Sequence, residues 1–95
     1  PRSPSLHDPA ILELAYSNFG TLVRRYPNSK FAGDAYQRMV YLRNQMAEKE
    51  ILIARFYIER KSWLSSAKRA KAVVVKYPDT IWIKEALDIM LLSYQ

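Results

Sequence analysis

The stretch Tyr26–Ala35 reads YPNSKFAGDA, and an altered copy, YPDTIWIKEA, follows at Tyr77–Ala86. Each copy opens with Tyr-Pro, continues with a small polar pair and closes with an acidic residue followed by Ala. Apolar segments with helical spacing precede and follow each copy. Because proline ends a helix and a small polar residue can cap the next one, each copy predicts a helix end followed by a helix start. The repetition predicts helical hairpins stacked side by side, an architecture that binds other proteins.

The composition limits the class of protein. Ninety-five residues make one small domain or a piece of a larger one. A hydrophobic content of 49% with two Gly favours a folded, helix-rich chain, and the absence of Cys excludes disulfides, thiolate metal sites and a thiol nucleophile. No apolar run approaches the roughly 20 residues of a membrane span. The chain opens without a signal peptide and stops inside a helical pattern, so we expect a fragment of a larger protein.

The chain divides into a short lead-in and a helical part. Residues 1–7 carry two Pro and two Ser without periodicity, which predicts an extended lead-in, and residues 8–95 form the repeats. His7 has neither a second His nor a Cys to accompany it, so a metal site is unsupported. Asp8-Pro9 is a strong helix start. Trp63 and Trp82 are expected to have core or helix-packing roles. The apolar stripes are formed by Ile11, Ala15, Phe19, Leu22, Val23 and Tyr26, by Trp63, Ala67, Ala70, Val74 and Tyr77, and by Ile83, Ala86, Leu87, Met90 and Tyr94.

The segment from Phe31 to Arg60 leaves two interpretations open. It contains no Pro, and its apolar residues form two successive stripes, Ala35, Met39, Leu42 and Met46, then Ile51, Ala54, Tyr57 and Ile58. The phase slips at Ala47–Glu50. Either the segment is one long helix whose buried face rotates, or it is two helices with a tight break; the good helix formers across the slip favour one helix.

Local signals predict the helix ends in more detail. Asn28 or Ser29 caps the second helix, and Ser62 can cap the third. Gly20 stands in the middle of the first helix, where glycine costs about 1 kcal/mol against Ala. Close packing by a neighbouring helix is the expected reason for this glycine.

The spacing of the two copies is informative. Pro27 and Pro78 lie 51 residues apart, whereas tetratricopeptide repeats have a period of about 34 residues with two helices each. The long segment 31–60 accounts for the excess. We therefore expect an all-α fold of tetratricopeptide-like helical hairpins, an α-solenoid, with one over-long helix.

With this spacing the chain resembles the C-terminal half of the BamD family, also called ComL or YfiO, outer-membrane lipoproteins of the bacterial β-barrel assembly machine. Lys61 departs from the pattern, because a turn Gly is common at this position, and the family's N-terminal repeats, lipidated Cys and C-terminal tail have no counterpart in this sequence. The matching residues are Asp8-Pro9, Phe19, Leu22-Val23, Tyr26-Pro27-Asn28-Ser29, Asp34-Ala35, Arg38, Leu42, Ala47, Glu50, Ala54, Tyr57, Glu59-Arg60, Arg69, Tyr77-Pro78-Asp79-Thr80, Ala86-Leu87 and Tyr94.

The resemblance implies a scaffold or adaptor at the periplasmic face of the outer membrane. Members of the family hold the last POTRA domain of BamA and join the other Bam lipoproteins; the membrane is reached through a lipid anchor outside this sequence. The resemblance places a partner-binding Arg at Arg69, where a guanidinium can pair with a carboxylate of BamA in a planar two-bond geometry. Arg60, Lys61 and Lys68 extend this basic region. An ordinary solvated or intra-repeat Arg is the alternative interpretation.

Other functions find less support in the sequence. No Ser-His-Asp set, phosphate loop or metal-ligand cluster is present, so neither catalysis nor a cofactor is expected. Glu50 lies beside an apolar stripe, where we expect it to pair with Lys49 or with an Arg of the next helix. The net charge of +6 would permit nucleic-acid binding, but there is no recognition motif and the aromatic residues follow the core stripes. A generic periplasmic tetratricopeptide module that binds proteins is the nearer alternative.

Overall fold

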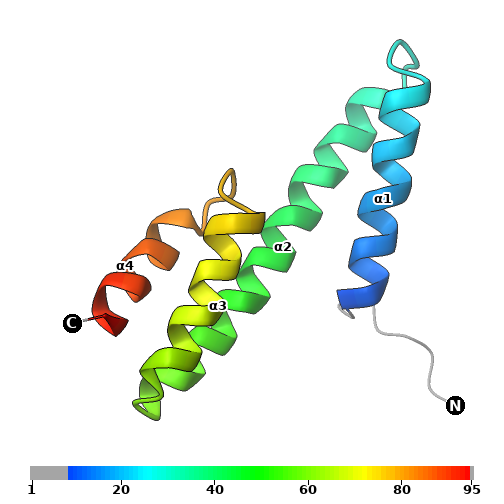
Figure 1. Cartoon of the computed structure of the whole chain (residues 1–95). Helices are drawn as coiled ribbons and strands as arrows, with labels where there is room; N and C mark the ends of the chain where they lie inside the picture. The colour runs from blue at the N-terminus through cyan, green and yellow to red at the C-terminus, as the bar shows by residue number, and fades with distance from the viewer. Residues whose placement is uncertain (1–8, 95) are drawn as a thin grey trace, which may run out of the picture. The chain divides into compact units, whose positions relative to one another are not determined.

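A computed structural model of the chain describes residues 9–94, and these residues form four α-helices (Figure 1). The chain divides into two compact units, residues 1–43 and 44–95. The expected lead-in at 1–7, His7 and the Asp8 cap lie outside the described residues. The predicted all-α hairpin architecture is confirmed by the helices α1 (Pro9–Arg25), α2 (Ala32–Glu59), α3 (Trp63–Lys76) and α4 (Ile83–Ser93).

Both Tyr-Pro sequences end a helix, as predicted. Helix α1 stops at Arg25 and α3 stops at Lys76, each directly before the tyrosine. Proline cannot donate a hydrogen bond, and it also disfavours helical geometry in the residue before it. At the first turn Ser29 rather than Asn28 assists the restart, because the Ser29 Oγ accepts a hydrogen bond from the Phe31 N–H at 3.2 Å.

Segment 31–60 forms one helix. Helix α2 runs unbroken for 28 residues, so the continuous interpretation is confirmed. Its residues as far as Arg43 belong to the first unit, and those from Asn44 onward belong to the second. The slip in the apolar pattern at Ala47–Glu50 therefore does not break the helix; it follows the point where the helix passes from one unit to the other.

Helix α2 is followed by a turn in which Lys61 has a left-handed backbone conformation, with φ of 59°. The Ser62 N–H donates to Tyr57 O and the Lys61 N–H donates to Ile58 O, both at 2.9 Å. This pair of bonds is the Schellman motif, which usually places glycine where Lys61 stands. Ser62 occupies the N-cap position of α3, but its side chain makes no capping hydrogen bond, so the predicted side-chain cap is wrong.

The first unit is a hairpin of α1 and the N-terminal part of α2 (Figure 1). Few of its side chains are buried, chiefly Leu12, Ala32 and Ala35. Gly20 is also buried, and a Cβ at this position would lie 3.8 Å from the Met39 side-chain methyl of α2 and 3.2 Å from the Arg24 Nη1 of its own helix. The contact with α2 is an ordinary van der Waals distance and the tighter one is within α1, so close packing by a neighbouring helix does not explain Gly20.

The second unit has a denser core to which three helices contribute. Helix α2 from Asn44, α3 and α4 share a buried cluster made mostly of small and branched residues. Small residues let the helix axes approach closely, and partly buried larger side chains close the edges of the cluster. The cluster contains Ala47, Ile51, Ala54, Ala70, Val73, Ala86 and Ile89, with Ile58, Val74, Tyr77, Trp82 and Met90 packed against it.

Some positions on the predicted stripes are wrong. Trp63 is not a core residue, because it lies exposed at the start of α3, whereas Trp82 packs against the core as expected. Tyr26, Leu87 and Tyr94 are also exposed. Among the buried residues that the stripes omitted are Leu12, Ala32, Ala47, Ser66, Val73 and Ile89. Each is displaced by one to three positions from a predicted core residue, because the sequence period alone does not fix which side of a helix faces its neighbour.

Candidate protein-binding site

The residue that sequence analysis ranks first, Arg69, lies on α3 and reaches across to α2. Its Nη1 lies 3.4 Å from Glu50 Oε2 and 3.5 Å from Glu50 Oε1. Of the two partners expected for Glu50, Lys49 or an Arg of the next helix, the Arg is observed. The Arg69 side chain remains 44% exposed and that of Glu50 is 24% exposed. This contact is an intra-repeat pair, but it leaves much of the guanidinium in solvent.

Arg60 is held against its own helix. Its guanidinium carbon lies 3.5 Å from the centre of the Phe56 ring, and its Nη1 donates to the Phe56 carbonyl at 3.2 Å. A cation over an aromatic face at an exposed site contributes about 0.5–1 kcal/mol. Arg60 therefore packs over one face of a ring that is still 48% exposed near the end of α2.

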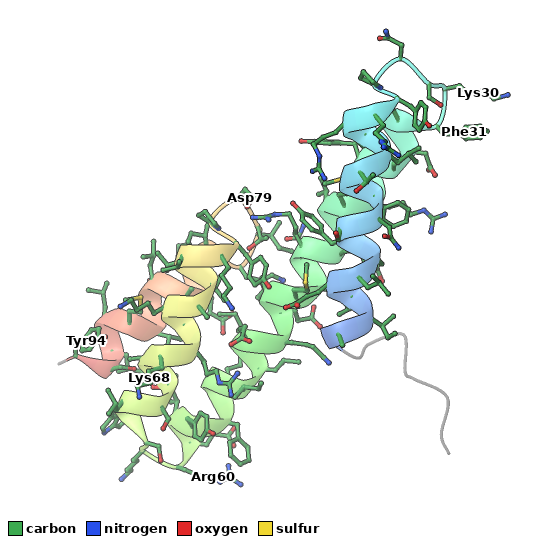
Figure 2. The ribbon with its side chains drawn as sticks, turned by 45° about the vertical axis from the view of Figure 1, so that its right-hand side comes forward. Lys30, Phe31, Arg60, Lys68, Asp79 and Tyr94 are labelled. Atoms are coloured by element: carbon green, nitrogen blue, oxygen red, sulfur yellow. The ribbon has the colours of Figure 1, made fainter. Side chains whose placement is uncertain are left out.

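Lys61 and Lys68 are both exposed. Lys61 belongs to the α2–α3 turn, and Figure 2 shows Arg60 at this turn and Lys68 farther along α3. Because successive helix residues are rotated by about 100°, Lys68 and Arg69 point in different directions from α3. The four predicted residues thus lie between the α2–α3 turn and the middle of α3, and they do not converge on one point.

A second ion pair joins α2 to α4. Arg55 Nε lies 2.5 Å from Glu85 Oε2, and Arg55 Nη2 lies 2.6 Å from Glu85 Oε1, which is a two-nitrogen, two-oxygen fork. These hydrogen bonds raise the pKa of Arg55 and lower the pKa of Glu85. Burial acts in the opposite direction, because it lowers the pKa of Arg55 and raises that of Glu85. The Arg55 guanidinium also lies 5.8 Å from the centre of the Trp82 ring. The fork fastens α4 to the core.

Sequence reasoning did not find the Arg55–Glu85 pair. One signal was available, because Glu85 is the acidic residue of the second YPxx copy and Asp34 is its counterpart in the first. Asp34 instead pairs with Arg38 of its own helix at 3.8 Å. The motif therefore marks the position of the acid but does not specify its partner.

Several aromatic residues are exposed, contrary to the expectation that they follow the core stripes. In the first unit these residues are Tyr26, Phe31, Tyr36 and Tyr41, and in the second they are Phe56, Trp63 and Tyr94. Figure 2 shows Lys30 and Phe31 at the tip of the first turn, where the Lys30 ammonium lies 5.2 Å from the Phe31 ring centre. Exposed aromatic side chains of this kind are enriched at protein-binding surfaces.

Across residues 9–94, no three His, Cys, Asp or Glu side chains are grouped as metal ligands would be. None of the helices described has the length and apolar character to span a membrane.

The helical hairpins, their small-residue core and the basic groups on α2 and α3 define a helical-repeat protein of the tetratricopeptide-like class. A family model described as outer membrane lipoprotein, YfiO, matches residues 2–95, and the chain belongs to this family. The resemblance found in the sequence is confirmed.

Curated relatives agree with the family assignment. The chain is 39% identical over 88 residues to the outer membrane protein assembly factor BamD of Vibrio cholerae, which covers 93% of this chain and 36% of the relative. It is 40% identical over 88 residues to BamD of Neisseria gonorrhoeae, and this alignment covers 93% of the chain and 33% of the relative. For BamD of Haemophilus influenzae the identity is 40% over 84 residues, and this alignment covers 88% of the chain and 32% of the relative. The chain spans about a third of the length of the curated relatives it matches.

Proposed function

We propose that this chain is a non-enzymatic adaptor in the assembly of bacterial outer-membrane proteins, and that it binds the POTRA region of BamA. The names of its relatives, outer membrane protein assembly factor, support the process. Residues 8–95 would be the C-terminal repeats of a longer lipoprotein at the periplasmic face of the outer membrane. The longer protein would reach the membrane through its lipid anchor and would also join the other Bam lipoproteins.

The geometry of Arg69 is the observation that carries the proposal. Its Nη1 contacts Glu50, but within residues 9–94 its Nε and Nη2 make no hydrogen bond. Guanidinium nitrogens on one edge bind a carboxylate through two parallel hydrogen bonds. Arg69 therefore keeps the groups needed to receive an acidic side chain of a partner. Arg55 has its Nε and Nη2 bound to Glu85 and does not offer the same edge.

Exposed Lys68 and Lys61 would contribute positive charge around this contact. Charges at the rim of an interface steer association more than they hold the complex. Substituting either lysine should therefore change the rate of association more than the rate of dissociation.

A titration of the chain against the periplasmic region of BamA tests the proposal. Arg69→Glu should weaken binding about 30-fold or more, because truncating one member of a buried charge pair costs about 2–5 kcal/mol. The matched control is Lys71→Glu, which makes the same change in charge at another exposed position of α3. It should change the dissociation constant by no more than about threefold, since rim charges contribute little.

The outcomes separate the candidate functions. Equal weakening by both substitutions would indicate a general charge effect and would contradict the role of Arg69. No binding to BamA by the unaltered chain would reject the adaptor in favour of a generic protein-binding module. Binding to duplex or single-stranded nucleic acid at low salt, with a steep loss at higher salt, would instead indicate a nucleic-acid function.

A further inference from the structure

The second unit contains two Arg–Glu pairs between helices, and their geometries differ. In the Arg55–Glu85 pair, two nitrogens meet two oxygens at 2.5 and 2.6 Å. In the Arg69–Glu50 pair, a single nitrogen, Nη1, meets both oxygens at 3.4 and 3.5 Å. The first pair is a closed fork, whereas the second uses only one corner of the guanidinium.

Glu50 is well placed to orient Arg69. Glu50 is the more buried of the two side chains, and on α2 it directly precedes Ile51, which is fully buried in the core. The residue after Arg69 on α3 is Ala70, also fully buried. Both side chains therefore start from backbone that the core holds in place, and the carboxylate fixes one end of a long and otherwise mobile side chain.

We propose that Glu50 is a positioning residue for partner binding: it holds Nη1 of Arg69 so that the Nε–Nη2 edge faces an external carboxylate. This inference rests on the proposed function of Arg69. An Arg side chain has large rotamer entropy, and ordering it before association lowers the cost of binding. The partner group is then a carboxylate of an acidic protein surface, presented in the plane of the guanidinium.

A competing effect determines whether removing Glu50 strengthens or weakens binding. Glu50 carries a negative charge, and it would repel an incoming carboxylate. If repulsion outweighs orientation, removing Glu50 strengthens binding; if orientation prevails, removing it weakens binding. Glu50 contacts Nη1 alone and leaves the Nε–Nη2 edge unoccupied, so an incoming carboxylate would not compete with Glu50 for the same hydrogen bonds, which favours orientation over competition.

The experiment measures binding of the full chain to the periplasmic region of BamA with Glu50→Ala, Glu50→Gln and Glu59→Ala. Glu50→Ala should weaken binding about fivefold, because one long side chain must then be ordered on association. Glu50→Gln keeps an oxygen that accepts from Nη1, so it should bind within about twofold of the unaltered chain. Glu59→Ala removes the same charge from an exposed position of the same helix and should have no effect.

Two further measurements distinguish positioning from a merely structural role. In an Arg69→Lys background, Glu50→Ala should have no further effect on binding, because an ammonium group has no planar edge to orient. Nitrogen-15 relaxation of the Arg69 Nε, measured without partner, should show a restricted side chain that becomes mobile in Glu50→Ala. Circular dichroism should show the same helix content in all variants.

Tighter or unchanged binding by Glu50→Ala would overturn the inference, as would an Arg69 Nε that is equally mobile with and without Glu50. If the unaltered chain does not bind BamA, or if Arg69→Glu binds equally well, the proposed function fails. The relaxation measurement is independent of that failure, since it needs no partner.

Discussion

In the first Tyr-Pro turn the Tyr26 N–H donates to Leu22 O at 2.9 Å, and in the second the Tyr77 N–H donates to Val73 O at 2.8 Å. Further backbone hydrogen bonds of the first turn recur in the second, with donor and acceptor each shifted by 51 residues. Their N–H donors are Ser29, Ala32 and Ala35 in the first turn and Thr80, Ile83 and Ala86 in the second. The backbone hydrogen bonding of the two turns is therefore the same.

The surroundings of the two turns are not the same. Tyr26 is 58% exposed and Phe31 is 61% exposed, whereas their counterparts Tyr77 and Trp82 pack against the core of the second unit. Thr80 is buried in the second turn, while its counterpart Ser29 is half-buried.

The second turn is also tied to a further helix. Asn44 Oδ1 of α2 accepts a hydrogen bond from the Ile81 N–H at 2.9 Å, and the Tyr77 hydroxyl donates to Met46 Sδ at 3.7 Å. The comparison teaches that the motif specifies a local backbone, while burial of its aromatic residues depends on a third helix that packs beside the turn. Substituting matched pairs of residues, one from each copy of the motif, tests this difference.

The largest difference is expected for the aromatic pair. Trp82→Ala should lower the free energy of unfolding by about 2–3 kcal/mol, less than the roughly 3–5 kcal/mol of a fully buried aromatic residue, because Trp82 is half-buried. Phe31→Ala should change it by no more than about 0.5 kcal/mol, as is usual for exposed positions. Urea denaturation followed by circular dichroism measures both. Equal losses would show that the first turn is buried in solution.

A smaller difference is expected for the hydroxyl pair. The Thr80 Oγ1 donates to the Tyr77 carbonyl at 2.8 Å in a buried position, so Thr80→Val should cost about 1–1.5 kcal/mol. Ser29→Ala removes an acceptor at a half-buried helix start and should cost about 0.5 kcal/mol. The same denaturation measurement applies. A larger loss from the serine substitution would contradict the assigned roles.

The smallest difference concerns the acidic pair and depends on pH. Because the hydrogen bonds from Arg55 lower the pKa of Glu85 in the folded state, its stabilisation is complete above the ordinary value of 4.5 and is lost as the pH falls through the lowered folded pKa. The Glu85→Gln variant should lose about 0.5–1 kcal/mol at neutral pH, and less as the solution becomes acidic.

Asp34→Asn is the matched control for Glu85→Gln. Asp34 and its partner Arg38 are both strongly exposed and lie on one helix, so about 0–0.5 kcal/mol is expected from their pair. Denaturation across the acidic range measures both variants. A Glu85→Gln chain with the same acid dependence as the unaltered chain would show that the Arg55 fork does not persist in solution.

Much of the fold could be predicted because its signals are local. The two prolines, the acidic residues after them and the unbroken run of helix formers between Phe31 and Arg60 act within a few residues of their own positions. The spacing of 51 residues then distinguished the over-long helix, and the matched residues indicated the family. A partner for Glu50, either Lys49 or an Arg of the next helix, was also predicted, since a carboxylate beside an apolar stripe requires a partner.

The sequence by itself thus determined the four helices, the positions of the turns and the family. The tertiary structure decided which aromatic rings are buried, and that Arg55 is closed on Glu85 while Arg69 keeps an open edge. The physical reason is that these outcomes depend on side chains that are far apart in the chain, at 30 residues for Arg55 and Glu85 and 19 for Arg69 and Glu50. A repeated motif fixes hydrogen bonds along the chain, but only packed helices determine what faces each of its side chains.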